Sequence, residues 1–237
     1  MIHLESVDST NNYAAKLLAS GTLESGTVIL ADEQYAGRGQ RGAEWVAQPG
    51  MNLILSFFVN EVNLAVDQQF FLSKMVAVGI QRFLRKYDVH AKIKWPNDMY
   101  VNNLKIGGVL VENQLKGNHV HSSIIGIGLN INQVEFGHLP ATSLKLETGR
   151  SFPLRELRLS FIHSMNSAFE AFWTRREALD SAYLSELYRF KIPGTYKDKD
   201  GLFTGTIVDV MPSGHLCVER DGKGQLYDLK EIRFIPD

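Results

Sequence analysis

A glycine-rich segment at residues 37–42 places the tightest limit on how this chain can fold. Its sequence, GRGQRG, matches the G-x-G-x-x-G pattern of dinucleotide-binding proteins. In those proteins the loop leads straight into a helix whose N-terminus binds the pyrophosphate. Here residues 43–50 read AEWVAQPG, which predicts a turn followed by another strand. The segment therefore argues against alternating β-α-β units and against a nicotinamide-dependent dehydrogenase.

The same loop is suited to a different chemistry. Glycine lets the backbone approach a phosphate closely, and the guanidinium group of Arg38 or Arg41 can donate two hydrogen bonds to its oxygens. The sequence contains neither the G-x-x-x-x-G-K-[ST] phosphate-binding signature nor the catalytic motifs of protein kinases. Taken alone, the loop is also compatible with a solvated surface bend.

Hydrophobic periodicity along the chain predicts both helices and strands. Helices are predicted from the cap-type residues 8–11 to Gly21, over about 68–87, and over a long region that begins at Pro153, with a further helical piece that reaches Tyr188. Strands are predicted over 26–33, 52–59, 91–95 with 99–101, 105–112 and 122–131, with hairpin turns at 102–103 and 116–118. This order predicts an α+β fold, in which helices pack on a mixed, largely antiparallel sheet.

The composition changes after Ile192. Residues 193–237 contain short strand-like runs separated by turn residues at Gly201, 211–214 and 221–222. A stretch of about 45 residues of this kind predicts a small C-terminal β-barrel of the SH3-like type. We therefore expect two units, a catalytic domain at 1–192 and the barrel at 193–237.

Composition excludes several classes of protein. Lysine and arginine number 25 against 26 aspartates and glutamates, so we expect no nucleic-acid partner. Cys217 is the only cysteine, which rules out an intrachain disulfide and a cysteine metal cage. The N-terminus lacks a signal-peptide pattern, and no apolar run reaches the roughly 18 residues of a membrane helix. We expect a cytoplasmic protein without membrane contact.

Two further motifs combine charge with glycine. Residues 94–98 read KWPND at the end of a strand, and residues 105–112 read KIGGVLVE. Paired glycines weaken a strand unless a ligand or another backbone must come close. Lys105 could place its ammonium group against whatever approaches. The glycines of GIGLNIN at 126–132 repeat this pattern, so the three segments together predict a ligand-lined sheet. A surface Lys–Asp pair with a turn proline is the alternative for 94–98 alone.

In order and spacing, these motifs resemble those of biotin–protein ligases over essentially the whole chain. The resemblance rests on Asp8-Ser9-Thr10-Asn11, Gln34, GRGxRG at 37–42, Trp45, KWPND, KIGGVLVE and GIGLNIN. It implies a reaction in two steps. Biotin and Mg-ATP form biotinyl-5′-AMP and pyrophosphate, and a lysine of a biotin carboxyl carrier protein then attacks the mixed anhydride and releases AMP.

The resemblance also implies the residues of the site. Because two anions must meet, cations should dominate catalysis, and Lys105 and Arg38 are the expected ones. Biotin is expected to contact Ser9, Thr10, Asn11, Gln34, Arg38, Gly39, Gln40, Lys105, Gly107, Gly108, Gly126 and Gly128. ATP is expected to contact Arg38, Gln40, Arg41, Trp45, Asn52, Lys94, Asn97, Lys105 and Asn130. Asp98 is expected either to hold the Lys94 region or to help place Mg²⁺, which enters with ATP and has no dedicated protein cage.

One residue departs from the family pattern. Many members have arginine at the fourth loop position, where this chain has Gln40. An amide can donate a hydrogen bond but brings no charge, so we expect Gln40 to hold the adenylate less tightly than arginine would.

Two alternatives to a biotin–protein ligase are open. A lipoate ligase or octanoyl transferase would share the fold, although GRG with KWPND favours biotin. A biotin-responsive DNA-binding regulator is disfavoured, because the first motif already begins at Asp8. Relatives can dimerise through sheet edges, so a homodimer is one expectation for the assembly.

Overall fold

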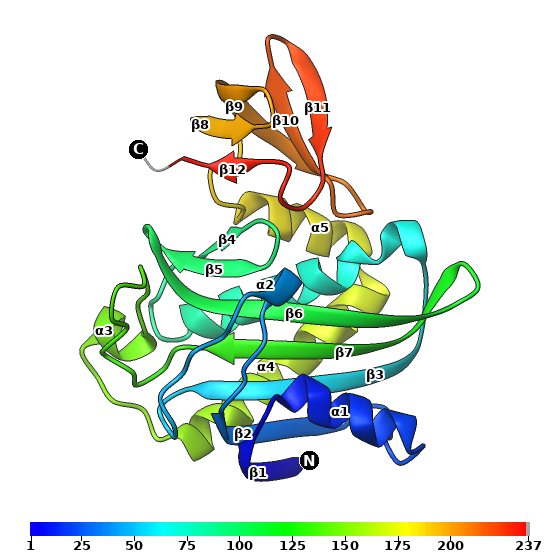
Figure 1. Cartoon of the computed structure of the whole chain (residues 1–237), viewed down its shortest axis with the longest axis vertical. Helices are drawn as coiled ribbons and strands as arrows, with labels where there is room; N and C mark the ends of the chain where they lie inside the picture. Colours follow the sequence, from blue (N-terminus) through cyan, green and yellow to red (C-terminus); the bar gives the residue numbers. More distant parts are fainter. Residues whose placement is uncertain (236–237) are drawn as a thin grey trace.

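The computed structural model describes residues 1–235, apart from the side chains of Arg41 and Phe172. At its centre lies a seven-stranded sheet with the order β1-β2-β3-β7-β6-β5-β4 (Figure 1). β1 (Ile2–Val7) pairs in parallel with β2 (Val28–Gln34), and the other strand pairs of this sheet are antiparallel. The predicted α+β fold with a mixed, largely antiparallel sheet is confirmed.

The remaining strands of this sheet lie close to the predicted positions. They are β3 (Leu53–Ala65), β4 (Lys92–Lys94), β5 (Asp98–Val101), β6 (Leu104–Lys116) and β7 (His119–Leu129). Both predicted hairpin turns are present, with a positive φ of 53° at Asn102 and 61° at Gly117. The strand β1 was not predicted, although Ile2 and Leu4 alternate with the exposed His3 and Glu5 and pack on the apolar cluster beneath α1.

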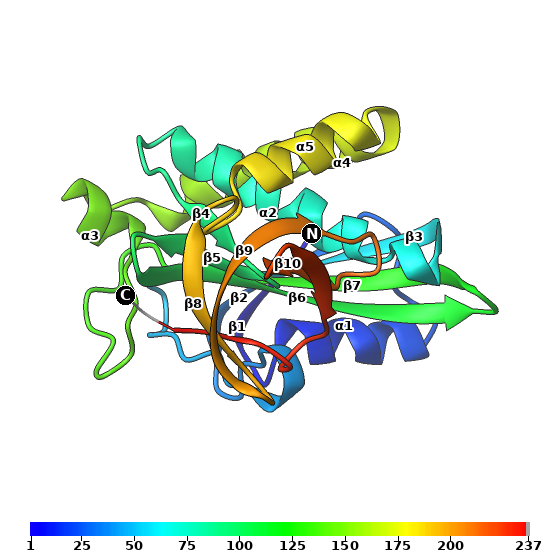
Figure 2. The ribbon, with the colours of Figure 1, turned by 90° about the horizontal axis from the view of Figure 1, so that it is seen from above.

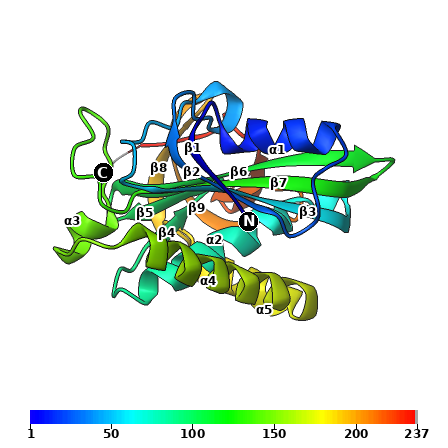
Figure 3. The same ribbon diagram turned by 90° about the horizontal axis from the view of Figure 1, so that it is seen from below.

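Helices cover the two faces of the sheet unequally (Figure 3). α2 (Phe70–Arg85), α4 (Leu154–Thr174) and α5 (Arg176–Ser185) pack on one face, and α1 (Thr10–Ala19) lies on the other. A short α3 (Leu144–Thr148) and the 3₁₀ helices η1 (Gln40–Gly42) and η2 (Val66–Gln68) complete the set. No helix in the described part of the chain is long and apolar enough to cross a membrane.

Alternation along the strands divides the core between the two faces. Phe57 belongs to the large apolar cluster beneath α2, α4 and α5, whereas Phe58 belongs to a small cluster with Ala14, Ile29 and Ile124 beneath α1. The small cluster covers only part of the α1 face. The rest of that face is therefore available for a binding site.

The C-terminal residues form a second, five-stranded antiparallel sheet with the order β11-β10-β9-β8-β12. Its strands are β8 (Pro193–Asp198), β9 (Gly201–Val210), β10 (Leu216–Arg220), β11 (Lys223–Tyr227) and β12 (Arg233–Phe234). The predicted all-β unit is present. Its closure into a barrel and the division of the chain into domains at residue 193 stay predictions.

The C-terminal sheet, which Figure 2 shows from above, is fixed to the rest of the molecule by buried contacts. Trp95 Nε1 donates a hydrogen bond of 2.8 Å to the carbonyl of Gly214. Lys74 on α2, only 1% exposed, donates to the carbonyl of Val210 at 2.7 Å and pairs with Asp180. Because one apolar cluster continues across this junction, the C-terminal sheet holds a defined position beside β4 and β5.

Candidate functional site

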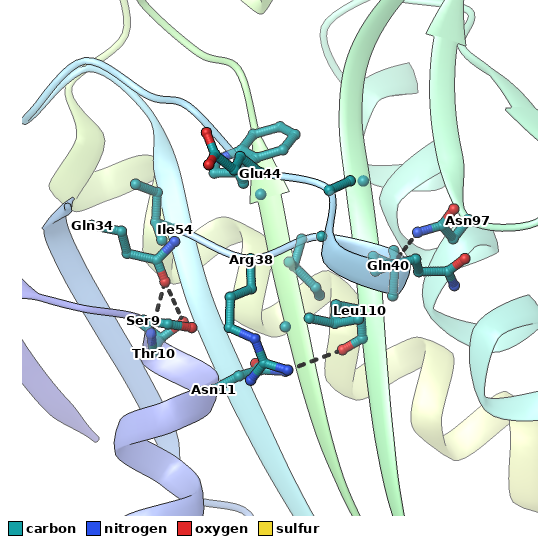
Figure 4. A pocket seen from close by; sticks show the side chains of 18 of the residues that line it. Ser9, Thr10, Asn11, Gln34, Arg38, Gln40, Glu44, Ile54, Asn97 and Leu110 are labelled. Carbon is teal, nitrogen blue, oxygen red and sulfur yellow. Dashed lines mark hydrogen bonds between the residues drawn. The ribbon is translucent and has the colours of Figure 1, made fainter. Parts of the chain in front are cut away.

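A cavity lies on the α1 face of the sheet, beneath the segment that contains the glycine-rich loop (Figure 4). Alternate residues of three neighbouring strands face it, because side chains on a strand repeat every two residues. Read across β3, β7 and β6, two successive rows are Ile54–Gly128–Gly108 and Ser56–Gly126–Leu110. The central residue of each row is a glycine, so no side chain covers the middle of the sheet there, and this creates the hollow.

Most of the predicted site residues meet at this cavity. Those that line it are Ser9, Thr10, Asn11, Gln34, Arg38, Gly39, Gln40, Trp45, Asn97, Asp98, Lys105, Gly108, Gly126 and Gly128. Gly107, Asn52, Lys94 and Asn130 lie outside the lining, and the Arg41 side chain lies outside the described part of the structure. Ala43, Glu44, Ile54, Val109, Leu110 and Ile127 line the cavity without having been predicted.

The start of α1 is held by Gln34 from the neighbouring strand. Gln34 Oε1 accepts hydrogen bonds from the Thr10 backbone N–H at 2.7 Å and from the Thr10 hydroxyl at 3.0 Å. Ser9 occupies the N-cap position, but its side chain makes no capping hydrogen bond. The prediction that the side chains of residues 8–11 cap the helix is wrong for Ser9. Gln34 binds the first-turn N–H instead, and this ties the helix end to the cavity wall.

Ser56 is a site residue that the sequence analysis missed. It is fully buried, and its Oγ lies 2.7 Å from Thr10 Oγ1 and 2.6 Å from Asn11 Oδ1. Its presence in the apolar run NLILSFFV was the available signal, because a buried hydroxyl needs hydrogen-bond partners. Ser56 supports Thr10 and Asn11 from beneath.

The two predicted catalytic cations each pair with a carboxylate. Lys105 Nζ lies 2.7 Å from Asp98 Oδ1, and Arg38 Nη2 lies 2.8 Å from Glu112 Oε1. Asp98 was expected to hold the Lys94 region or to help place Mg²⁺. Its contact with Lys105 was not predicted and is a further role. Such half-exposed pairs contribute at most about 1 kcal/mol to stability. Their main effect is therefore to fix where the two charges stand.

The glycines of β7 make room for side chains of the site itself. A Cβ atom at Gly126 would lie 2.4 Å from Asn11 Oδ1, and a Cβ atom at Gly128 would lie 2.4 Å from the Trp45 ring. The close approach inferred from the glycines is thus made by Asn11 and Trp45. Trp45 Nε1 is buried and has no hydrogen-bond partner among the described residues, so it is a donor that a ligand could satisfy.

The amides of Asn52 and Asn130 hold the backbone near the end of β7. Asn52 Nδ2 donates to Gln133 Oε1 at 2.6 Å, and Asn52 Oδ1 accepts from the Ile131 N–H at 3.0 Å. Asn130 Nδ2 donates to the carbonyl of Thr142 at 3.0 Å. Both side chains are buried outside the cavity, so the predicted contact of either amide with a nucleotide gains no support from this geometry.

A groove continues from the cavity toward the C-terminal sheet. Gln40 and Asn97 line both hollows. The other residues of the groove are Lys94, Trp95, Pro96, Leu229, Lys230, Ile232, Arg233 and Phe234. Lys94 Nζ stands 4.2 Å from the centroid of the Tyr100 ring, and burial lowers the pKa of its ammonium group. The groove carries positive charge from both sheets.

The described residues contain no group of three or more His, Cys, Asp or Glu side chains placed to hold a metal ion. The carboxylates that line the cavity belong to Glu44 and Asp98, and Asp98 is engaged by Lys105. A divalent cation at this site would therefore take most of its ligands from a bound phosphate or from water.

Comparison with known proteins points to one family. The model of the "Biotin/lipoate A/B protein ligase family" matches residues 3–130. A biotin–[acetyl-CoA-carboxylase] ligase of Paracoccus denitrificans is 30% identical over 249 residues, covering 98% of this chain and 99% of its own. The bifunctional ligase/repressor BirA of Bacillus spizizenii is 36% identical over 134 residues, a match that covers 56% of this chain and 41% of that protein.

Solved structures agree with the sequence comparisons. A biotin protein ligase from Aquifex aeolicus, in complex with biotin and ATP, superposes with a TM-score of 0.81 and 25% identity. The match covers 99% of this chain and 98% of that one. The likeness therefore includes the C-terminal sheet as well as the central one.

Proposed function

Because the chain belongs to the biotin/lipoate A/B protein ligase family, we propose that it is an ATP-dependent biotin–protein ligase. One observation carries the proposal. The cavity places two paired cations, Lys105 and Arg38, beside the hydroxyl and amide groups of Thr10, Asn11 and Gln34. A neutral, hydrogen-bonding head group and an anionic tail are the two halves of biotin.

The polar end of the cavity fits the ureido head of biotin. Gln34 Oε1 is occupied by Thr10, which leaves the Gln34 amide nitrogen as a donor toward a ligand. Ser9 and Thr10 supply hydroxyl groups at the start of α1. Donors and acceptors thus stand side by side, as a cyclic urea with one C=O and two N–H groups requires.

The charged end of the cavity fits the chemistry of adenylation. A carboxylate oxygen of biotin attacks the α-phosphorus of ATP, so a C–O–P linkage forms while the bond to pyrophosphate breaks. Lys105 and Arg38 offset the negative charge where the two anions meet. In the second step a deprotonated lysine amine attacks the acyl carbon, and AMP departs with the electron pair of the broken C–O bond.

The neighbouring groove fits the nucleotide. The Trp45 ring borders the cavity and can stack on adenine, while Lys94, Lys230 and Arg233 bring positive charge near the phosphates. Mg²⁺ would arrive with ATP and supply further charge neutralisation. The C-terminal sheet provides two of these three cations, so we infer that it assists the use of ATP.

The acceptor we propose is the carboxyl carrier protein or domain of a biotin-dependent carboxylase, as the name of the Paracoccus ligase suggests. We place the reaction in the cytoplasm, where ATP is available and the lone Cys217 stays reduced. A homodimer stays a prediction.

The choice of acid tests the proposal directly. We expect biotin to support ATP–pyrophosphate exchange, whereas lipoate and octanoate should support at most a few per cent of that rate. A purified protein that exchanges faster with lipoate or octanoate would instead be a ligase of the other branch of the family.

Gln40 is expected to retain the adenylate weakly. It lines the cavity and the groove, and an amide offers no charge to the phosphate of biotinyl-AMP. Gln40→Arg should therefore slow the release of biotinyl-AMP by about tenfold, the effect of one added charge-assisted hydrogen bond. Release is measured by trapping labelled adenylate and following its dissociation. Equal or faster release from the arginine variant would contradict the idea.

A further inference from the structure

Glu112, near the middle of β6, joins three elements beside the cavity. Its Oε2 accepts a hydrogen bond from Asn11 Nδ2 on α1 at 2.7 Å. Its Oε1 accepts one from Arg38 Nη2 in the glycine-rich loop at 2.8 Å. Glu112 itself does not line the cavity and instead lines a second hollow that the glycine-rich loop also borders. An influence of Glu112 through hydrogen bonds must therefore pass through Asn11 and Arg38.

The contact with Glu112 is the shortest one that the Asn11 nitrogen makes, and it helps to set which end of the Asn11 amide faces inward. The two ends of an asparagine side chain have nearly the same shape but opposite hydrogen-bonding character. A carboxylate only accepts, so Glu112 draws the Asn11 nitrogen toward itself, and the carbonyl of Leu110 accepts from the same nitrogen at a longer 3.5 Å. Asn11 Oδ1 then points to Ser56 Oγ and to the space above Gly126. Asn11 consequently presents an acceptor at the floor of the cavity.

The guanidinium group of Arg38 is held from two sides, by Asn12 and by Glu112. Asn12 Nδ2 donates to Asp8 at 3.0 Å, which turns Asn12 Oδ1 toward Arg38 Nη1 at 2.6 Å. The guanidinium group is thus held between an amide oxygen and the Glu112 carboxylate. Figure 4 shows Arg38 reaching from the loop toward Asn11. One carboxylate therefore binds both the residue that presents the acceptor and the cation of the site.

We propose that Glu112 is a positioning residue for the biotin half of the reaction, acting by orienting the Asn11 amide and by holding the Arg38 guanidinium. The inference rests on the proposed function as a biotin–protein ligase. In this role Glu112 acts through Asn11 and Arg38 and does not itself contact the substrate.

A positioning role and a purely electrostatic role of Glu112 predict opposite changes in the KM for biotin. Glu112 is only 34% exposed and stands beside a site for anions, so its charge by itself repels them. If charge were the whole effect, removing it would lower the KM for biotin. If position is what matters, removing it raises that KM. The sign of the change separates the two roles.

Glu112→Gln is the first variant. Its single oxygen can accept from Asn11 or from Arg38, and its nitrogen then faces a second donor. We expect the KM for biotin in ATP–pyrophosphate exchange to rise about tenfold, with a smaller change in the KM for ATP. Glu5→Gln, an exposed carboxylate on β1, is the matched control and should behave like the native protein. Thermal unfolding reports whether each variant is folded.

The second experiment exchanges the amide of Asn11 with the carboxylate of Glu112. Asn11→Asp alone sets two carboxylates against each other and should raise the KM for biotin further than Glu112→Gln does. The double variant combines Asn11→Asp with Glu112→Gln. In it, the nitrogen of the introduced glutamine donates to the introduced aspartate, while the glutamine oxygen accepts from Arg38. Because donor and acceptor match again, the KM for biotin should fall below that of either single variant. Only a direct amide–carboxylate contact predicts this reversal.

Two results would overturn the inference. One is a folded Glu112→Gln variant whose KM for biotin is unchanged or lowered. The other is a double variant no better than the worse single variant. Absence of biotin-dependent exchange in the native protein would be a separate finding, since it would contradict the proposed function rather than the role of Glu112.

Discussion

Lys105→Ala is expected to reduce biotin-dependent ATP–pyrophosphate exchange by about 10²–10³-fold, the usual effect of removing one preorganised group that stabilises developing charge. Lys105 borders the cavity and is fixed by Asp98 at 2.7 Å. Its loss removes one positive charge and leaves the Asp98 carboxylate facing two incoming anions. The effect should therefore appear mainly in the adenylation step, measured as kcat/KM of the exchange reaction.

A lysine elsewhere on the same strand provides the control. Lys116 ends β6 at the exposed hairpin, far from the cavity lining, so Lys116→Ala should keep native exchange activity. Lys105→Arg keeps the charge but changes its shape, and should recover only part of the loss. Exchange within about threefold of native in a folded Lys105→Ala variant would remove Lys105 from the mechanism, because the expected loss is far larger.

Gly126→Ala and Gly128→Ala are expected to damage different halves of the reaction. The new Cβ at residue 126 would meet Asn11 Oδ1 at 2.4 Å, and at residue 128 it would meet the Trp45 ring at the same distance. Overpacking of this kind costs about 1–3 kcal/mol, or roughly 10–100-fold in binding. Gly126→Ala should mainly raise the KM for biotin, and Gly128→Ala should mainly raise the KM for ATP.

Each of these variants serves as the control for the other, because both add one methyl group to the same strand two residues apart. Gly224→Ala, on β11 of the C-terminal sheet, tests the effect of alanine in a strand away from the cavity. There the nearest atom, Cys217 Sγ, is 3.3 Å from the added Cβ, so activity should persist. Equal changes in both KM values for the two β7 variants would show that they act by general distortion of the sheet.

Local sequence signals were sufficient for much of the fold. Helical periodicity predicted α2 and α4, because apolar side chains on one helix face repeat at every third or fourth residue. The turn chemistry of Asn102 and Gly117 predicted the two hairpins. The absence of a helical pattern directly after the glycine-rich loop excluded the dinucleotide-binding fold. Each of these inferences depends on residues within a few positions of one another.

The resemblance to biotin–protein ligases implied most of the residues that line the cavity, including Lys105, Arg38 and Gln34. Motif matching does not distinguish a side chain that faces a ligand from one that supports the backbone. Asn52 and Asn130 were expected at the nucleotide on the same grounds; both side chains are buried beside the loop after β7, and their contact with a nucleotide stays a prediction. Whether each of these amides faces a ligand or binds the backbone depends on its neighbours in space, and residue type alone does not determine it.

Only the tertiary structure determined which groups act on one another. Ser56 contacts Asn11 across 45 positions of the chain, and Glu112 contacts it across 101. These contacts depend on the register of β3, β7 and β6 and on the placement of α1 over that face. The strand β1 likewise exists because β2 offers it hydrogen-bond partners. Such partners are set by the docking of whole elements. The apolar run around Ser56 indicates that its hydroxyl needs a partner, but the residues near Ser56 or Glu112 in sequence do not specify which partner that is.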